Sequence, residues 1–364
     1  MTGELVLLTG GTGFLGYTIL IDLLKHGYRV RIPARSHAKI ARVRAAPSIA
    51  ALDPPETHLM FVLVPDMAAP GAYDEAVQDV ELIIHAAAPL PADHAGEAGH
   101  REDAKLEDAF VTACVQGNLG ILKSAHEKGK RVRRIVMTSS TVAIAPAEFY
   151  SDAAAAAQRE AGEEIVRGSD TRILIPMPPY KSQLHAYCAA KTASLKAAED
   201  FIRDYSPLFD MISIMPSLVF GKDELATGTS STGIMMSRLL PGTDANDSNN
   251  NNIRQGEITA VGNSVLCTDV ARAHVRALDA DIEGNQSFVL NTDAKWEDTV
   301  PIAKSQFPRE FESGLFRPGG PQWTTVPLKW DTSKVQDVLG IKLATYDVMI
   351  KEVVGEYIEK TGSE

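Results

Sequence analysis

Short apolar runs alternate with stretches of helical periodicity over most of the chain. The runs that we interpret as buried strands lie at residues 5–8, 29–33, 59–64, 82–85, 134–137, 211–215 and 286–290. Between them, apolar residues recur at helical spacing in stretches such as 109–128 and 191–205. This alternation favours an α/β fold in which helices cover both faces of a doubly wound parallel sheet.

The first predicted strand is followed directly by a glycine-rich turn. Gly10, Gly13 and Gly16 recur at every third position, and Gly11-x-Gly13-x-x-Gly16 forms a second register. A helix is predicted to follow, because apolar residues recur at helical spacing: Ile19, Leu20, Leu23 and Leu24. We expect this helix to end at Gly27, a typical residue at a helix C-terminus. A strand, a glycine turn and a helix N-terminus together are typical of a dinucleotide-binding unit, whose free N–H groups bind phosphate.

The pattern changes from about Gly221 onward. Residues 227–233 and 244–252 are predicted loops, the second a low-complexity polar tract. Asp269 is the predicted N-cap of a helix that runs through Ala273 to Leu278. We therefore expect a Rossmann-type dinucleotide-binding domain over residues 1–220, to which parts of 256–295 return, and a smaller lobe formed mainly by 221–364.

Composition narrows the possible partners and location. The formal net charge of −11 over 364 residues argues against a nucleic-acid partner, which would favour a basic surface. No stretch of about 18 consecutive apolar residues predicts a membrane span. The chain enters its first strand without a signal-peptide pattern, and its three cysteines are too far apart for a metal-type pair. We expect reduced thiols, no metal site and a cytoplasmic location.

Tyr187 and Lys191 form the first candidate catalytic pair. Residues four apart share one face of a helix. A lysine ammonium beside a phenol favours the tyrosinate, so that the phenol can give a proton to a carbonyl oxygen and take it back. Taken alone, this spacing is more often a surface helix pair.

A second candidate element is the sequence RIVMTSSTV at residues 134–142, where a predicted strand ends in hydroxyl residues. Open α/β sheets bind their ligands beyond the carboxyl ends of the strands. A serine there can donate to a substrate carbonyl oxygen and stabilise developing negative charge. Ser139 and Ser140 are both candidates, although such hydroxyls more often cap helices.

With these motifs together, the chain resembles the extended short-chain dehydrogenases/reductases. More narrowly, it is similar to the branch of dihydroflavonol 4-reductases, cinnamoyl-CoA reductases and yeast NADPH-dependent aldehyde/carbonyl reductases. The resemblance covers nearly the whole chain and rests on TGGTGFLG, VRIPARSHAK, HAAAP, MTSSTV, YCAAK, MPSLVFG and STGIMMS, the last of which leans toward the yeast enzymes. It implies a Rossmann-type domain, a C-terminal substrate lobe and nicotinamide-dependent reduction of a small-molecule carbonyl substrate, an aldehyde or a ketone.

The resemblance also implies roles for individual residues. Ser140 is the catalytic serine, with Ser139 as the near alternative, Tyr187 is the acid/base and Lys191 also holds the nicotinamide ribose. Asp66 and Met67 would contact the adenine, and Ala86–Ala88 would line the cofactor site. The segment from Pro216 to Val219 would pack beside the nicotinamide. The full set of implied cofactor-binding residues is Gly10, Thr12, Gly13, Phe14, Leu15, Gly16, Arg35, Lys39, Asp66, Met67, Ala86, Ala87, Ala88, Thr138, Tyr187, Lys191, Pro216, Leu218, Val219 and Ser230.

The second strand predicts which cofactor is used. An NAD enzyme of this fold usually carries Asp or Glu about 20 residues beyond the glycines. No acidic residue occurs here between Asp22 and Asp53, and Arg35 stands where the ribose should lie. A guanidinium suits a 2′-phosphate, and Lys39 adds a second charge if a helix begins at Ser36. We therefore expect NADPH/NADP+ as cofactor.

Two further positions concern the surroundings of the lysine and of the cofactor loop. The helix asparagine that the family uses to order a water near the lysine falls on Gln116 here. Asn118 lies about 200° farther round the helix, so we do not expect it to substitute. His85 ends a predicted buried strand beside the cofactor loop, and a structural, hydrogen-bonded role is favoured over catalysis.

Two other functions use the same scaffold. A sugar-nucleotide epimerase or dehydratase would share the fold and the triad, but related dehydratases carry an acidic pair after the strand-end hydroxyl, where this chain has residues 141–144 without a carboxylate. A non-catalytic nucleotide sensor would usually lack the tyrosine and lysine. The adjacent residues Met235 and Met236 favour core packing over a place in the substrate pocket. A monomer and a homodimer are both compatible with the sequence.

Overall fold

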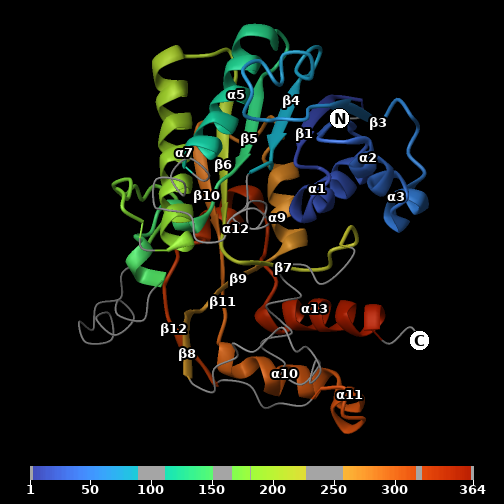
Figure 1. Ribbon diagram of the computed structural model, residues 1–364, viewed down its shortest axis with the longest axis vertical. Helices are drawn as coiled ribbons and strands as arrows, with labels where there is room; N and C mark the ends of the chain where they lie inside the picture. Colours follow the sequence, from blue (N-terminus) through green and yellow to red (C-terminus); the bar gives the residue numbers. More distant parts are fainter. Residues whose placement is uncertain are drawn as a thin grey trace.

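The chain folds around a seven-stranded parallel sheet (Figure 1). The computed structural model describes residues 3–88, 111–150, 166–180, 182–226, 257–316 and 322–361. The strand order is β10-β6-β5-β4-β1-β2-β3, so the direction of the order reverses between β1 and β4. The strands are β1 (Leu5–Thr9), β2 (Arg29–Ala34), β3 (Leu59–Leu63), β4 (Leu82–His85), β5 (Arg134–Thr138), β6 (Asp210–Pro216) and β10 (Gln286–Leu290).

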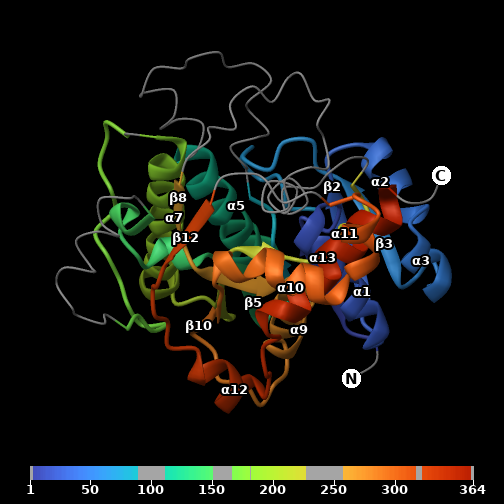
Figure 2. The ribbon, with the colours of Figure 1, turned by 90° about the horizontal axis from the view of Figure 1, so that it is seen from below.

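Helices cover both faces of this sheet, as the alternating pattern predicts (Figure 2). One face packs against α1 (Phe14–Lys25), α9 (Cys267–Arg276) and α12 (Ser333–Leu339). The other packs against α5 (Ala113–Lys128) and α7 (Gln183–Tyr205). β1 and β4 are buried along their whole length, because each contacts two strands and a helix layer on either side. The predicted doubly wound fold is confirmed.

The ends of the helices follow local sequence signals in most cases. α1 begins after Gly13, and Gly27, at φ +78°, ends the turn that stops it. α7 begins at Gln183 and includes both the predicted stretch 191–205 and the Tyr187–Lys191 pair, and the Ser182 hydroxyl caps the helix by accepting a hydrogen bond from the His185 N–H. The end of α5 is as predicted, whereas part of its predicted start, residues 109–110, lies outside the described residues.

The predicted cap at Asp269 is wrong. α9 begins at Cys267, and its N-cap is Leu266. The Asp269 carboxylate instead lies in the first turn, almost fully buried, and accepts a hydrogen bond from the Ala344 N–H at 2.6 Å. A distant backbone donor and Arg272 therefore take the oxygens that would otherwise cap the helix.

The remaining described elements, most of which are short, lie mostly beyond the carboxyl edge of the sheet, in the lower part of Figure 1. There, β11 (Thr292–Asp293), β9 (Asn263–Leu266) and β7 (Val219–Phe220) form one small sheet, and β12 (Gln322–Val326) pairs with β8 (Glu257–Val261). Trp296, Phe316 and Met349 belong to the core of this lobe. The other elements are α2 (His37–Arg44), α3 (Pro47–Leu52), η3 (Thr141–Ala143), η4 (Ala147–Tyr150), η5 (Trp296–Asp298), α10 (Thr299–Gln306), α11 (Pro308–Glu312) and α13 (Tyr346–Thr361).

The chain returns from the lobe to the main sheet. α9 packs against α1, and β10 pairs in parallel with β6, so residues from the last third complete the sheet edge. The predicted loops at 227–233 and 244–252, together with Ser230, Met235 and Met236, lie outside the described residues. Within the described ranges, no helix has the length and hydropathy needed to cross a membrane.

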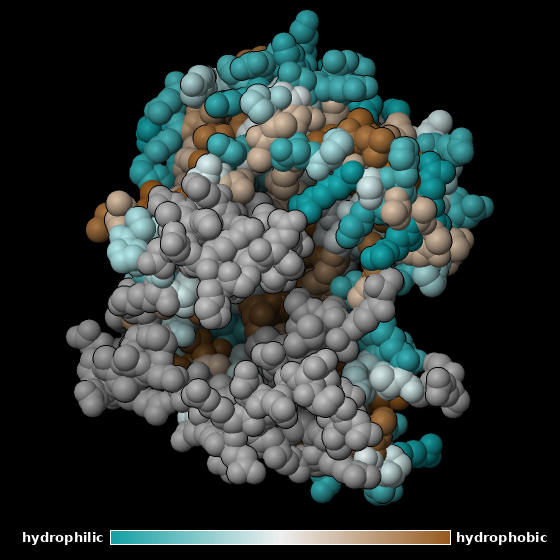
Figure 3. All heavy atoms as spheres, in the orientation of Figure 1, coloured by the Kyte–Doolittle hydropathy of each residue, from teal (hydrophilic) through white to brown (hydrophobic). Residues whose placement is uncertain are grey.

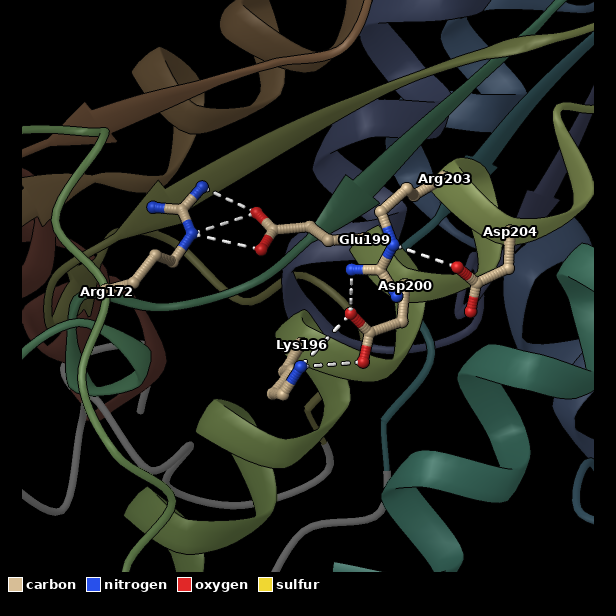
Figure 4. A network of polar contacts seen from close by, with 6 residues as sticks. All are labelled: Arg172, Lys196, Glu199, Asp200, Arg203 and Asp204. Carbon is tan, nitrogen blue, oxygen red and sulfur yellow. Dashed lines mark hydrogen bonds and ion pairs between the residues drawn. The ribbon is translucent and has the colours of Figure 1, made fainter.

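The outer face of α7 carries an ion-pair network (Figure 4). Arg172, in the segment that precedes the helix, donates to Glu199 with an Nε–Oε1 distance of 3.0 Å. Asp200 binds both Lys196 and Arg203, and Arg203 also binds Asp204. Exposed pairs contribute little to stability individually. The Arg172 contact nevertheless holds the preceding segment against the helix that carries the candidate catalytic residues.

Candidate active site

A cleft of about 860 Å³ lies at the carboxyl edge of the sheet, between the sheet and the lobe. Figure 3 shows the surface hollowed between these two parts, with hydrophobic side chains at the base of the hollow. Residues at the ends of β1, β4, β5 and β6 line the cleft, as do residues of α7 and of the lobe. The cleft therefore spans the point between β1 and β4 where the strand order reverses, which is where open α/β sheets bind ligands.

Two glycines of the turn are required by close approaches of the chain to itself. Gly10 has φ +76°, and a Cβ there would lie 2.7 Å from the Ala87 backbone nitrogen. A Cβ at Gly16 would lie 2.0 Å from the Gly10 carbonyl oxygen. These contacts let the first turn of α1 press against β1 and the loop after β4, which brings the helix N-terminus to the cleft.

Gly13 is different, because the folded chain leaves room beside it. A Cβ there would have the Gly10 oxygen, at 3.5 Å, as its nearest neighbour. Gly13 is the N-cap of α1, and no side chain caps the helix. The first N–H groups of α1 thus face the cleft without a side-chain acceptor, and a diphosphate fits this cradle. The residues present therefore fit the predicted dinucleotide.

The two cations predicted for a 2′-phosphate both line the cleft. α2 begins at His37, one residue after the start that the role of Lys39 required, and the Ser36 hydroxyl accepts from the Lys39 N–H at 3.4 Å. Arg35 and Lys39 are thereby placed at the end of β2. Burial raises the pKa of the phenol of Tyr73, another cleft residue, and the positive charge of Arg35 partly offsets this rise.

Tyr187 and Lys191 share one face of α7 and both line the cleft. The Lys191 Nζ lies 5.9 Å from the centroid of the Tyr187 ring. The lysine is only 8% exposed, whereas the tyrosine is partly exposed toward the cavity. An ammonium held near the phenol in a partly desolvated site is the arrangement that favours proton transfer by the tyrosine.

Ser139 and Ser140 follow β5 and also line the cleft. Ser140 is 9% exposed; its Oγ accepts from the Val142 N–H and donates to the Pro216 carbonyl oxygen, each at 3.4 Å. It thus also caps η3. The Ser139 N–H donates to the Ile214 carbonyl oxygen at 2.7 Å. The assignment of the catalytic role to Ser140 stays a prediction.

His85 has the structural bonding expected of it. Its Nδ1 lies 2.8 Å from the Thr9 hydroxyl and its Nε2 lies 3.1 Å from Asn118 Oδ1. Burial, together with a smaller contribution from the nearby positive charge of Lys191, lowers the pKa of His85 to about 4. The ring is therefore neutral at physiological pH and joins β1, β4 and α5 beneath the cofactor loop.

The α5 positions near Lys191 differ from the family pattern. Gln116 is exposed, so it does not face the lysine, and Asn118 binds His85. Cys114 is also on α5; burial raises the pKa of its thiol, and the positive charge of Lys191 lowers that pKa. Cys114, Cys188 and Cys267 are all free and buried. Among the described residues, no group of His, Cys, Asp or Glu is arranged to hold a metal ion.

Most of the predicted site residues meet in this one cleft. Its lining includes the three predicted catalytic residues and nearly all of the predicted cofactor set: Gly10, Thr12, Gly13, Phe14, Leu15, Gly16, Arg35, Lys39, Met67, Ala86, Ala87, Ala88, Thr138, Pro216, Leu218 and Val219. Asp66 is not among the lining residues, and its carboxylate accepts from the Ala68 N–H at 2.9 Å. Ser230 lies outside the described residues.

Several cleft residues were not predicted. Tyr150 comes from η4, and burial raises the pKa of its phenol. Val261, Asn263 and Trp296 come from the lobe. The Trp330 indole donates to Asn263 Oδ1 at 3.2 Å, which fixes this amide at the wall of the cleft. No local sequence signal marks these residues, because only the tertiary fold brings them opposite the sheet edge.

The chain belongs to the NAD dependent epimerase/dehydratase family, whose model matches residues 6–291. This confirms the predicted place among the extended short-chain dehydrogenases/reductases. The chain is 31% identical to Ketoreductase CTB6 of Cercospora nicotianae, over 99% of this chain and 96% of that protein.

Two further comparisons are with proteins of Candida albicans. The chain is 24% identical to a putative NADPH-dependent methylglyoxal reductase, GRP2, of Candida albicans, over 97% of this chain and 98% of that protein. The crystal structure of Gre2 from Candida albicans, in complex with NADPH, superposes with a TM-score of 0.77 at 22% identity, over 98% of this chain and 99% of that one. The likeness to Gre2 supports the fold.

Proposed function

We propose that the protein is an NADPH-dependent reductase that converts an aldehyde or ketone to an alcohol. The observation that carries this proposal is the shared cleft. The glycine turn, the Arg35–Lys39 pair, the strand-end serines and the Tyr187–Lys191 pair come from distant parts of the sequence and line one cavity. Each motif alone has a common structural explanation, whereas their convergence at the switch point of the sheet matches the requirements of carbonyl reduction.

In the proposed mechanism, Tyr187 donates its phenolic proton to the carbonyl oxygen. The Ser140 hydroxyl turns from the Pro216 carbonyl oxygen to donate a hydrogen bond to the same substrate oxygen and stabilises the negative charge that develops there. Lys191 keeps positive charge close to the phenol, so that the tyrosine can release and recover its proton. In the oxidative direction the same three groups act in reverse, with Tyr187 accepting the proton of the alcohol.

The residues that would hold the cofactor follow the cleft from one end to the other. The N-terminus of α1 at Gly13 would bind the diphosphate, Arg35 and Lys39 the 2′-phosphate, and Lys191 the nicotinamide ribose. When bound, the reduced nicotinamide supplies the hydride for the carbonyl carbon. Asp66 at the adenine and Ser230 stay part of the proposal as predicted contacts.

The relatives support the same chemistry. One carries the name ketoreductase and another the name NADPH-dependent methylglyoxal reductase. Dehydration is not favoured, because residues 141–143 form a buried turn without a carboxylate and residue 144 is a buried isoleucine, and the ketoreductase name of the relative favours reduction over epimerisation. The alternative of a non-catalytic sensor is not favoured, because the tyrosine and lysine are both present at the cleft.

The test is a spectrophotometric screen of NADPH oxidation by the purified protein. The panel comprises aromatic aldehydes, α-keto esters and diketones, each measured with NADPH and with NADH. We expect carbonyl-dependent oxidation of NADPH and formation of the matching alcohol. NADPH binding without turnover on any member would favour a sensor, and isomerisation of a sugar nucleotide without net oxidation would favour an epimerase.

We further propose that residues 1–220, with parts of 256–295, form the cofactor-binding domain and that 221–364 mainly form the substrate lobe. A cytoplasmic location and a monomer or homodimer complete the proposal. Sedimentation of the purified protein with and without NADPH distinguishes the two oligomeric states.

A further inference from the structure

Thr138, the last residue of β5, bonds to a histidine from the far side of the sheet. Its Oγ1 lies 2.8 Å from Nε2 of His274, which belongs to α9. The His274 side chain is 0% exposed, and its Nδ1 lies 2.8 Å from the Val270 carbonyl oxygen. The histidine thus has one partner on its own helix and one at the strand end that lines the cleft.

These two contacts determine where the protons lie. A carbonyl oxygen can only accept a hydrogen bond, so His274 Nδ1 carries the ring proton. Burial lowers the pKa of His274 to about 4, which keeps the ring neutral and leaves a lone pair on Nε2. The Thr138 hydroxyl must therefore donate its proton to His274, away from the cleft.

Thr138 consequently offers the cleft only lone pairs. It is partly exposed there, and within the described ranges no other group hydrogen bonds to its Oγ1. Thr9, at the end of β1, makes a useful contrast: it bonds to His85, but it is 0% exposed and its oxygen already accepts from the Ala87 N–H at 3.2 Å. The acceptor at Thr9 is used by the fold, whereas Thr138 lines the cavity and its Oγ1 has no second partner within the described ranges.

We infer that Thr138 accepts a hydrogen bond from an N–H or O–H donor on the nicotinamide half of the cofactor, and that His274 is the positioning residue that directs this acceptor into the cleft. The inference rests on the proposed function. The diphosphate cradle lies at β1, and the reacting groups lie beyond β5, so the nicotinamide half must pass over the end of β5. Its ribose hydroxyls and its carboxamide NH₂ are the donors available there.

The test measures NADPH affinity by fluorescence titration without carbonyl substrate. Thr138→Val keeps the shape but removes the acceptor, and should weaken NADPH binding by about 2- to 10-fold, the weight of one neutral hydrogen bond. Thr138→Ser should bind as wild-type protein does. His274→Phe frees the hydroxyl to rotate and should weaken binding partly, whereas His274→Gln, whose amide oxygen can accept from Thr138, should restore the affinity.

A cofactor analogue identifies the donor. If the effect of Thr138→Val disappears when an acetyl group replaces the carboxamide, the amide is the donor; if the effect persists, a ribose hydroxyl is. Thr299→Val is the matched control, because it removes a buried 2.6 Å bond to the Tyr346 hydroxyl inside the lobe. It should lower the melting temperature and leave NADPH affinity unchanged.

Two results would overturn the inference. Unchanged NADPH affinity in Thr138→Val would show that no cofactor donor meets this oxygen. Weakened binding in Thr138→Val with wild-type affinity in His274→Phe would show that the histidine serves only the fold. Failure of the proposed function is distinguishable, because it would appear as wild-type protein that binds NADPH without reducing any carbonyl compound.

Discussion

At the scale of single residues, the proposed reaction depends most directly on the phenol of Tyr187. Tyr187→Phe removes one oxygen atom and leaves the ring in contact with Lys191. NADPH should still bind, whereas turnover should fall by about 10²- to 10⁴-fold, the usual contribution of a positioned proton donor. Carbonyl-dependent NADPH oxidation by the two proteins measures this loss. Tyr205→Phe, on an exposed stretch of the same helix, is the control, and wild-type turnover in Tyr187→Phe would refute the mechanism.

The two strand-end serines can be separated by a matched pair of variants. Successive side chains on extended backbone point to opposite sides, so only one of the two can face the nicotinamide. Ser140→Ala should lose most of kcat, and Ser139→Ala should lose less. Because Ser140 also caps η3, the melting temperatures of both variants are needed to separate catalysis from folding. A reversed ranking of kcat would move the catalytic assignment to Ser139.

At the scale of elements, the glycine turn separates folding from cofactor binding. Gly13→Ala should fold, because the added Cβ meets only the Gly10 oxygen at 3.5 Å, but the methyl group would enter the phosphate cradle. We expect weaker NADPH binding with little change in melting temperature. Gly16→Ala should instead destabilise the protein strongly, because its Cβ would overlap the Gly10 carbonyl oxygen. Equal loss of stability in both variants would contradict the cradle at Gly13.

We predict that the β2–α2 junction determines the choice between NADPH and NADH. A charge-assisted hydrogen bond from Arg35 to the 2′-phosphate is worth about 1.5–3 kcal/mol, or roughly 10- to 150-fold in binding. Arg35→Ala should therefore raise KM for NADPH by about that factor and leave KM for NADH nearly unchanged. Steady-state kinetics with both cofactors measure the difference. A variant that weakens both cofactors alike would show that the phosphate is not bound here.

The elements that the sequence predicted well are those whose signals are local. The apolar run at residues 5–8, the glycines after it and the stop at Gly27 all lie within one βαβ unit, and each has its expected place. Asp269 was misassigned as a cap because its partner, the Ala344 N–H, is distant in sequence. A side chain that can cap a helix does so only when no stronger donor competes for its oxygens.

At the scale of the whole molecule, the candidate site also combines residues that local signals predict with residues that only the tertiary fold brings to the cleft. The glycine turn, the strand-end serines and the Tyr187–Lys191 pair were predicted because each forms a local motif, and the other residues of the sheet edge were implied by the family resemblance. Tyr150, Asn263 and Trp296 were not, because they reach the cleft only through packing of the lobe against the sheet edge. The direction of the Thr138 hydroxyl depends in turn on His274, which the chain supplies only after it has passed through the lobe. The side chains that line the sheet edge therefore come from several separate segments, and the orientation of Thr138 depends on a residue of the last third of the chain.

The stability of the whole molecule should fall as the pH drops below neutral. Burial lowers the pKa values of His85 and His274 to about 4, compared with about 6.5 in an unfolded chain. Between these values the unfolded state binds protons that the folded state does not, so the free energy of unfolding rises with pH. From pH 7 to pH 5, the protonation of each histidine in the unfolded state should lower the free energy of unfolding by on the order of 2 kcal/mol.

Comparison of wild-type protein with His274→Gln isolates one histidine from the other titrating groups. Burial raises the pKa values of Asp22, Asp223 and Glu352, which opposes the histidine effect, but these carboxyl groups are present in both proteins and cancel in the difference. Urea unfolding should show that the stability advantage of wild-type protein over His274→Gln shrinks by about 2 kcal/mol from pH 7 to pH 5. His37→Gln, at an exposed position in α2, should leave the pH dependence as in wild-type protein. A difference between wild-type protein and His274→Gln that is constant across this range would show that the buried ring takes up its proton as readily in the folded state as in the unfolded one.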